Sequence, residues 1–293
     1  MRVLITGSSG FIGRNLSKYL LEKEFIVLKI DKNQNTEDTI GADVKDSNVI
    51  QLIANLRPQI VIHLAAQIDV RKSFENPEDD FLTNCLGTLN VLKGAIEGGV
   101  ENFIYITSGG AIYDTSNKLP TSEDGKISPL SPYGISKLAG EFYVKALCNQ
   151  AKINWSALAL SNCYGPLTEN TNGVIPQWWK SLSNKNVVRI NGKDTTRDFI
   201  YVSDVVKAIY TVLKNPVNQR INISTGVETS LEELFTEMTQ IMNISSVPEV
   251  VDLSEGEVSR SSLENTKAKI LLGWEPEITL KQGLKMILDK ESF

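Results

Sequence analysis

Three glycines, Gly7, Gly10 and Gly13, recur at every third position just after a short apolar run at residues 3–5 of this 293-residue chain. A buried strand that turns through such glycines into a helix is typical of a dinucleotide-binding βαβ unit. The first glycine permits a tight turn, the second lets the backbone approach a pyrophosphate, and the third lets the helix pack closely on the sheet. The helix N-terminus offers free N–H groups to the phosphates. The turn predicts a dinucleotide site; the alternative is a tight strand–helix turn that binds no ligand.

Apolar runs and helical stretches alternate along the first half of the chain. Strand-like runs lie at residues 3–5, 25–30, 60–64, 103–106 and 155–160, and helical stretches include residues 11–22, 80–97 and 133–150. This alternation favours a parallel sheet with helices on both faces. We predict an α/β fold, a Rossmann-type doubly wound parallel sheet with a smaller C-terminal α/β substrate lobe.

Asp31 closes the second strand-like run, near the separation from the glycine turn at which a carboxylate meets the adenosine ribose. A carboxylate accepts hydrogen bonds from both ribose hydroxyls and repels a 2′-phosphate, so Asp31 favours NAD over NADP. The adjacent Lys32 weakens this preference, because a lysine can meet a phosphate. The alternative is a turn residue that simply ends the strand.

The character of the sequence changes after residue 164, where loop-like segments and then short mixed elements follow. We expect an NAD-binding Rossmann domain over residues 1–164 and a substrate-binding lobe over residues 165–293. The lobe is expected to be discontinuous, with residues 202–214 packing back on the first domain.

Composition argues against several classes of function. The net charge is −5 and no block of like charges occurs, so we expect no nucleic-acid partner. No apolar run approaches the roughly 18 residues of a membrane span, and the strand-like start leaves no signal peptide. We therefore expect a soluble cytoplasmic protein. Three scattered cysteines, Cys85, Cys148 and Cys163, lack metal-ligand spacing, so neither a metal site nor a disulfide framework is expected.

Tyr133 and Lys137, spaced as Tyr-Gly-Ile-Ser-Lys, lie one helical turn apart and therefore on one face of a helix. A nearby cation stabilises a phenolate, so the phenol can take a proton from a substrate hydroxyl near neutral pH and return it. A Tyr-x-x-x-Lys pair on its own is often only a helix surface. Downstream of a dinucleotide turn, it predicts a site for hydride and proton transfer.

With these motifs the chain resembles the extended short-chain dehydrogenase/reductase family over nearly its whole length, and within it the nucleotide-sugar 4-epimerases and 4-ketoreductases. Residues 162–166 (Asn-Cys-Tyr-Gly-Pro) are similar to its substrate loop, and residues 197–204 to a segment whose arginine binds nucleotide phosphates. The resemblance makes His63 more structural than catalytic. It also implies a homodimer built from helices near residues 80–97 and 133–150.

The family's functional positions can be carried over residue by residue. The resemblance implies catalytic roles for Ser108, Tyr133 and Lys137, and substrate contacts by Ser108, Tyr133, Asn162 and Arg197. It implies that NAD is held by Gly7, Gly10, Phe11, Ile12, Gly13, Asp31, Asp43, Val44, Leu64, Ala65, Ala66, Gln67, Asn84, Thr107, Tyr133 and Lys137.

Two positions depart from the family pattern. Relatives usually carry a catalytic Ser or Thr where this chain has Gly109, and we expect the preceding Ser108 to supply the hydroxyl. Relatives often carry a second phosphate-binding arginine where this chain has Ser254. Arg260 is a candidate substitute, and the alternative is a different recognition of the diphosphate.

Three functions remain open. Gly109 and Gly110 leave no carboxylate where a dehydratase needs one, which disfavours dehydration. The favoured reading is an NAD-dependent nucleotide-sugar 4-epimerase of the UDP-glucose or UDP-N-acetylglucosamine type, acting through a transient 4-keto sugar. The alternative is an NAD(P)H-dependent reductase of a nucleotide-linked 4-keto-6-deoxy sugar. A non-catalytic NAD-binding module is the third, and the presence of both Tyr133 and Lys137 argues against it.

Overall fold

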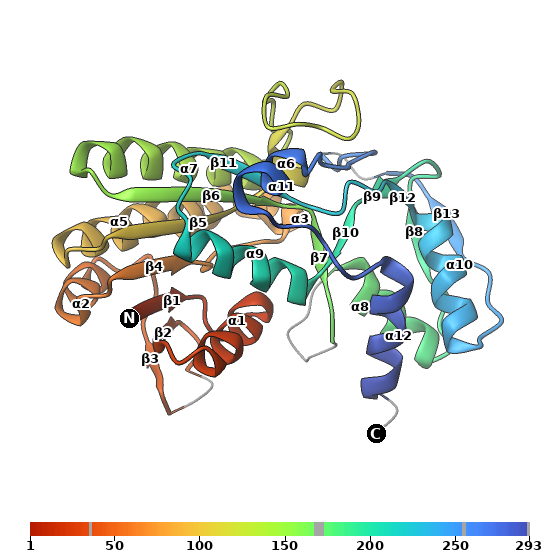
Figure 1. Ribbon diagram of the computed structural model, residues 1–293. Coiled ribbons are helices and arrows are strands. Elements are labelled where there is room, and N and C mark those ends of the chain that lie inside the picture. Colours follow the sequence, from red (N-terminus) through yellow and green to blue (C-terminus); the bar gives the residue numbers. More distant parts are fainter. Residues whose placement is uncertain (35–36, 167–172, 254–255, 292–293) are drawn as a thin grey trace.

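Seven strands form one parallel sheet within the computed structural model, which describes residues 1–34, 37–166, 173–253 and 256–291 (Figure 1). From edge to edge the order is β11-β6-β5-β4-β1-β2-β3. The strands are β1 (Arg2–Thr6), β2 (Ile26–Asp31), β3 (Thr39–Gly41), β4 (Ile60–His63), β5 (Asn102–Ser108), β6 (Asn154–Leu160) and β11 (Arg220–Ile223). The chain runs outward from β1 in one direction through β2 and β3, and in the other through β4, β5, β6 and β11. This arrangement confirms the doubly wound fold.

Helices cover both faces of the sheet (Figure 1). One layer is formed by α2 (Asn48–Leu56), α5 (Gly87–Glu97) and α7 (Pro132–Ala151), and the other by α1 (Phe11–Glu22) and α9 (Val202–Lys214). Alternate residues of β1 point to opposite layers: Leu4 belongs to the core under α2, α5 and α7, whereas Val3 and Ile5 belong to the core under α1 and α9. Burial on both faces explains why the strands read as continuous apolar runs.

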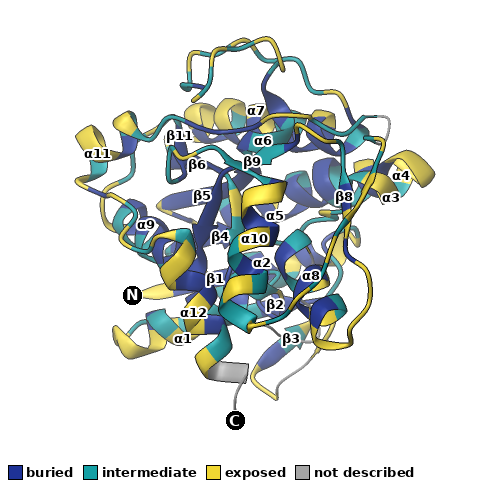
Figure 2. Ribbon diagram, turned by 90° about the vertical axis from the view of Figure 1, so that its right-hand side faces the viewer, coloured by how far each residue is buried: buried dark blue, intermediate teal, exposed yellow. Residues whose placement is uncertain are grey.

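The sheet strands are the most deeply buried part of the molecule, and exposed residues gather on the outer faces of the helices (Figure 2). Short connecting elements lie between β4 and β6: α3 (Val70–Glu75), α4 (Pro77–Phe81), the π-helical turn η1 (Leu82–Leu86) and α6 (Gly109–Ile112). The single helix expected over residues 80–97 is therefore three consecutive segments. Gly87, where α5 begins, packs so closely on Val44 that a Cβ there would lie 2.7 Å from its side chain.

The C-terminal part adds α8, α10 and α12 beside one end of the sheet, together with small two-stranded sheets (Figure 1). Its elements are β7 (Asn162–Tyr164), α8 (Val174–Ser183), β8 (Arg189–Asn191), β9 (Thr196–Arg197), β10 (Phe199–Tyr201), β12 (Thr229–Ser230), α10 (Leu231–Met242), β13 (Glu249–Val251), α11 (Thr266–Leu272) and α12 (Leu280–Glu291). The apolar core under α1 and α9 continues into this part without a break. Because β11 also joins the central sheet, both parts of the chain build it, and the division at residue 164 stays a prediction.

Helix α7 begins where the sequence has Ser131-Pro132. Pro132 occupies the first turn, where its missing N–H costs no hydrogen bond, and the Ser131 hydroxyl accepts from the Gly134 N–H at 3.2 Å. These caps set the start of the helix and hence the height of Tyr133 above the sheet.

Among the described residues, no helix combines the length and apolar character that crossing a bilayer requires.

Candidate active site

The glycine turn after β1 meets the loop after β4 at the carboxyl edge of the sheet, where the two directions of winding diverge. Gly7 has a positive φ of 72°, and a Cβ there would lie 2.6 Å from the backbone nitrogen of Ala65. Only a glycine fits this approach. The turn at Gly7 therefore packs directly against the loop at residues 64–67. Both lie at the position where open α/β sheets bind their ligands.

The N-terminus of α1 is open to a ligand on the side of Gly10. Gly10 is the N-cap, and no side chain caps the helix there. A Cβ on Gly13 would lie 2.3 Å from the Gly7 carbonyl oxygen, so Gly13 is required by packing. A Cβ on Gly10 would meet only that oxygen, at 3.2 Å. These residues fit a pyrophosphate lying against the first turn of α1, next to Phe11 and Ile12.

Asp31 ends β2 beside this turn and is buried. Its two carboxylate oxygens accept from the Ser9 N–H at 2.9 Å and from the Asn33 N–H at 2.8 Å. Asp31 therefore holds the glycine turn in addition to its predicted contact with ribose. The Asp43 carboxylate accepts from the Lys45 N–H at 2.9 Å, and Val44 packs under Gly87.

His63, the single histidine in the sequence, is fully buried, and both of its ring nitrogens take part in a series of hydrogen bonds inside the protein. The Thr88 hydroxyl donates to the Asn84 carbonyl at 2.6 Å, so it must accept from His63 Nε2–H at 3.0 Å. His63 Nδ1 then accepts from the Thr6 hydroxyl at 2.7 Å. Burial, together with the charge of Lys137, lowers the pKa of His63 to about 3. Both ring nitrogens are used internally, which gives this neutral histidine a structural role.

Asn84 lies in the π-helical turn η1 and holds the loop of Leu64, Ala65, Ala66 and Gln67. Its side-chain oxygen accepts from the Gln67 N–H at 2.8 Å, and its amide group donates to the Gln67 carbonyl at 2.9 Å. Single π turns are frequent at functional sites. The structure therefore places Asn84 beneath the loop that the resemblance assigns to the cofactor.

Tyr133 and Lys137 lie on the buried face of α7, next to the carboxyl end of β5. The Ser108 hydroxyl lies next to the Tyr133 phenol. Burial raises the pKa of that phenol, and the neighbouring Ser108 hydroxyl opposes the rise. Burial also lowers the pKa of Lys137 to about 7. From the sequence we expected the Lys137 cation to lower the pKa of the Tyr133 phenol. The pKa is raised instead, because burial penalises both the phenolate and the ammonium.

Two neighbours of Ser108 complete this corner of the site. The Thr107 hydroxyl is buried and has no hydrogen-bond partner among the described residues, so it is available to a ligand group. A Cβ on Gly109 would lie 2.2 Å from Leu263 Cδ1. The Leu263 side chain thus fills the place of a side chain at position 109, and Ser108 is the hydroxyl next to the phenol.

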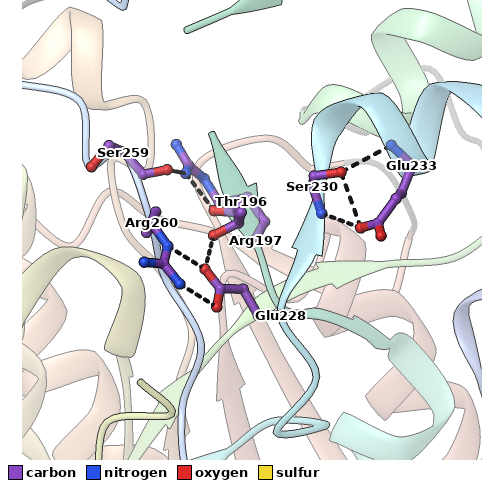
Figure 3. A network of polar contacts seen from close by, with 7 residues as sticks. All are labelled: Thr196, Arg197, Glu228, Ser230, Glu233, Ser259 and Arg260. Carbon is purple, nitrogen blue, oxygen red and sulfur yellow. Dashed lines mark hydrogen bonds and ion pairs between the residues drawn. The ribbon is translucent and has the colours of Figure 1, made fainter. Parts of the chain in front are cut away.

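Asn162 and Arg197 are brought together by short strands. β7 pairs in parallel with β10, and the Asn162 N–H donates to the carbonyl of Asp198 at 2.8 Å. Arg197 Nη1 donates to the backbone carbonyls of Thr196 and Ser259, at 2.7 and 3.1 Å (Figure 3). Burial lowers the pKa of this guanidinium. No carboxylate of the described residues forms an ion pair with it, which suits an anionic ligand.

Arg260, the candidate second phosphate ligand, is already engaged. Its guanidinium donates two hydrogen bonds to the Glu228 carboxylate, at 2.7 and 2.8 Å, and the Thr196 hydroxyl donates to the same carboxylate (Figure 3). The position of Ser254 lies outside the described residues.

In the described part of the chain, no group of three or more His, Cys, Asp or Glu side chains has the arrangement of a metal site.

Asp80 is a buried residue of this region that the sequence reasoning missed. Its carboxylate lies between Gln67, Asn84 and Ser136. An aspartate four residues before Asn84 on a helical stretch was the available signal, because that spacing places the two side chains on one face. The sequence contained nothing to show that this face is buried.

The family described as the NAD-dependent epimerase/dehydratase family matches residues 3–224. A UDP-glucose 4-epimerase from Mycolicibacterium smegmatis is 34% identical, over 97% of this chain and 96% of that protein.

Two solved structures show the same fold. The UDP-glucose 4-epimerase of Thermotoga maritima with UDP-glucose has a TM-score of 0.95 and 33% identity, covering 100% of both chains. That of Thermus thermophilus in complex with NAD has a TM-score of 0.91 and 28% identity, covering 99% of this chain and 98% of that one.

Proposed function

Because this chain belongs to the NAD-dependent epimerase/dehydratase family, we propose that it is a nucleotide-sugar 4-epimerase acting on UDP-glucose or UDP-N-acetylglucosamine. The observation that carries the proposal is the placement of Tyr133 and Lys137, one helical turn apart on the buried face of α7, against the end of β5 that carries Ser108. Two relatives with this fold are named UDP-glucose 4-epimerases, one with UDP-glucose and one with NAD.

NAD is the cofactor of this family. The open N-terminus of α1 at Gly10, the Asp31 carboxylate and the unpartnered Thr107 hydroxyl are the features of this chain that suit it. When bound, NAD⁺ supplies the hydride acceptor and a positive charge that favours the phenolate form of Tyr133.

The protein's own part in the reaction is to move one proton and to hold the sugar. Ser108 and Tyr133 converge on one oxygen of the substrate, the 4-hydroxyl. The phenolate of Tyr133 takes the proton from this hydroxyl as the carbon is oxidised, and Ser108 donates a hydrogen bond to the resulting 4-keto oxygen. Tyr133 returns the proton after the sugar has presented its other face. The protein ends as it began, which suits a retained cofactor.

Arg197 and Asn162 are proposed to hold the diphosphate that anchors the sugar during this rotation. A guanidinium without a carboxylate partner binds phosphate oxygens through paired hydrogen bonds. The half-buried Arg197 has this environment, and Asn162, the first residue of β7, lies beside it. The contact is remote from the reacting carbon, so the sugar ring can turn while the nucleotide stays bound.

The deciding experiment uses protein purified without added cofactor. We expect it to retain NAD and to interconvert UDP-glucose or UDP-N-acetylglucosamine with the corresponding 4-epimer without any reductant. Activity that requires stoichiometric NAD(P)H and a 4-keto-6-deoxy sugar would instead establish the reductase.

We also propose that the protein is a homodimer. Three apolar side chains on the outer faces of α4 and α7 are about half exposed: Phe81 (54%), Ile135 (57%) and Phe142 (52%). Helix α4 lies against α7, so these exposed apolar residues belong to neighbouring helices. Exposed apolar surface commonly marks a protein interface.

A further inference from the structure

Asp80 is a fully buried carboxylate without a cation at ion-pair distance in the described part of the chain. It accepts from Gln67 Nε2 at 2.9 Å, from Asn84 Nδ2 at 3.1 Å and from the Ser136 hydroxyl at 2.5 Å. Burying a charge is costly unless it is paired, and such groups concentrate at functional sites. The location of Asp80, next to the α7 face that carries Lys137, suggests what this charge is for.

The three hydrogen bonds connect separate parts of the site. Gln67 belongs to the loop after β4, Asn84 to η1 and Ser136 to α7. Ser136 has one hydroxyl proton, and the contact with Asp80 is its shortest, at 2.5 Å against 3.0 Å to the Tyr133 carbonyl. Asp80 thus ties the residue preceding Lys137 to the cofactor loop.

Of the two carboxylates that act on Lys137 in the described part of the chain, Asp80 is the one without an ion pair. Glu141, one turn further along α7, is held by Arg220 at 2.7 Å. Burial lowers the pKa of Lys137, and Asp80 provides the largest opposing effect. The titratable and charged groups that face Lys137 from the surrounding elements are Asp80 of α4, His63 of β4, Tyr105 of β5, and Tyr133 and Glu141 of α7. Of these, His63 is neutral in the fold and both tyrosines are protonated near neutral pH.

We propose that Asp80 is a positioning residue for the proton-transfer pair: its carboxylate is the counter-charge that keeps Lys137 an ammonium, and its bond to Ser136 sets the register of α7. This inference rests on the proposed function, because that function assigns proton transfer to Tyr133 and the supporting charge to Lys137. It concerns the charge state of Lys137, which can be observed without turnover.

The test is the pH dependence of Asp80→Asn, which removes the charge and nearly preserves the shape. Loss of a nearby negative charge favours neutral Lys137 and the phenolate of Tyr133, so both pKa values fall. We expect both limbs of the kcat profile to move to lower pH, by about one unit. Asp204→Asn is the matched control. Asp204 is equally buried but holds the Glu277 and Ile278 N–H groups and is not among the charges that shift the pKa of Lys137 or Tyr133, so its variant should keep both limbs unmoved.

A direct measurement separates this inference from the proposed function. NMR titration of protein labelled at lysine Cε, with the Lys137 signal assigned through Lys137→Arg, reports the ammonium itself. We expect its midpoint to fall in Asp80→Asn and to stay in Asp80→Glu, which retains the charge. Asp80→Ser, which leaves room for water, replaces Asp80→Asn if that variant does not fold. An unchanged midpoint in the folded charge-removed variant overturns the inference, even in an active epimerase. A shifted midpoint in a protein without epimerase activity supports it and defeats only the proposed function.

Discussion

The Lys137 ammonium lies 4.4 Å from the centre of the Tyr105 ring, and the Tyr105 hydroxyl donates to the Lys137 carbonyl at 3.0 Å. One side chain therefore supports both ends of this lysine, its backbone and its charge. Gly140 makes the arrangement possible, because a Cβ there would lie 2.5 Å from the Tyr105 oxygen. The result is a buried lysine whose position is set before any ligand arrives.

Removing the phenol should abolish most turnover. We expect Tyr133→Phe to lower kcat by at least about 100-fold, since a positioned acid–base group contributes this much or more. Tyr143→Phe, on the exposed side of the same helix, should leave kcat unchanged. Epimerisation of UDP-glucose measures both. Undiminished turnover in Tyr133→Phe would show that the phenol is not the acid–base group.

A methyl group at the second glycine should separate cofactor binding from folding. Gly10 has an ordinary φ of −72°, and its new Cβ meets only one oxygen, so Gly10→Ala should fold with a nearly unchanged melting temperature. After purification, its NAD content should be lower than that of the unmodified protein by about tenfold or more, because the methyl group occupies the side where the pyrophosphate approaches. Gly41→Ala, with only ordinary contacts to Gln34, is the control. Full NAD content in Gly10→Ala would contradict the predicted site.

The two arginines near the proposed diphosphate site should behave differently. Arg197→Lys keeps the charge but loses the paired hydrogen bonds, so KM for the nucleotide sugar should rise by about tenfold or more. Arg260→Met breaks an exposed pair with Glu228, and KM should stay within about twofold. A larger effect at Arg260 would mean that its pairing with Glu228 opens when substrate binds.

Acid should destabilise the protein through His63. Its pKa is about 3 in the folded protein against an ordinary 6.5, so between these values only the unfolded chain takes up the proton. The free energy of unfolding should therefore fall as the pH drops from 6.5 towards 3, by up to about 1.4 kcal/mol per unit. Urea unfolding at several pH values measures this slope. His63→Gln should have a lower free energy of unfolding at pH 7, but that free energy should depend less on pH below 6.5. If the variant keeps the slope of the unmodified protein, the acid sensitivity belongs to other groups.

A charge on the apolar side of α7 should break the proposed dimer. We expect Phe142→Glu to be monomeric by light scattering while the unmodified protein is dimeric, since an unpaired carboxylate is costly in an interface. Val247→Glu, at an exposed position outside that side, should remain dimeric. A monomeric unmodified protein at micromolar concentration would refute the homodimer.

The order of strands and helices was readable because each pattern is local. The start and end of α1 at Phe11 and Glu22 agree with the prediction, and all five predicted strand-like runs are strands of the sheet. The short strands β3 and β11 were missed, since three or four residues carry too little periodicity.

The sequence by itself determined the family, the fold class and the cofactor, because Gly7, Gly13 and the Tyr133–Lys137 spacing are short-range constraints on a backbone turn and on one helical face. Only the tertiary structure decided which groups share a buried environment: Ser108 against Tyr133, Leu263 in the space beside Gly109, and Asp80 behind Lys137. Burial and charge proximity arise from residues far apart in the chain. For that reason the direction of the Tyr133 pKa could not be read from its neighbours in sequence.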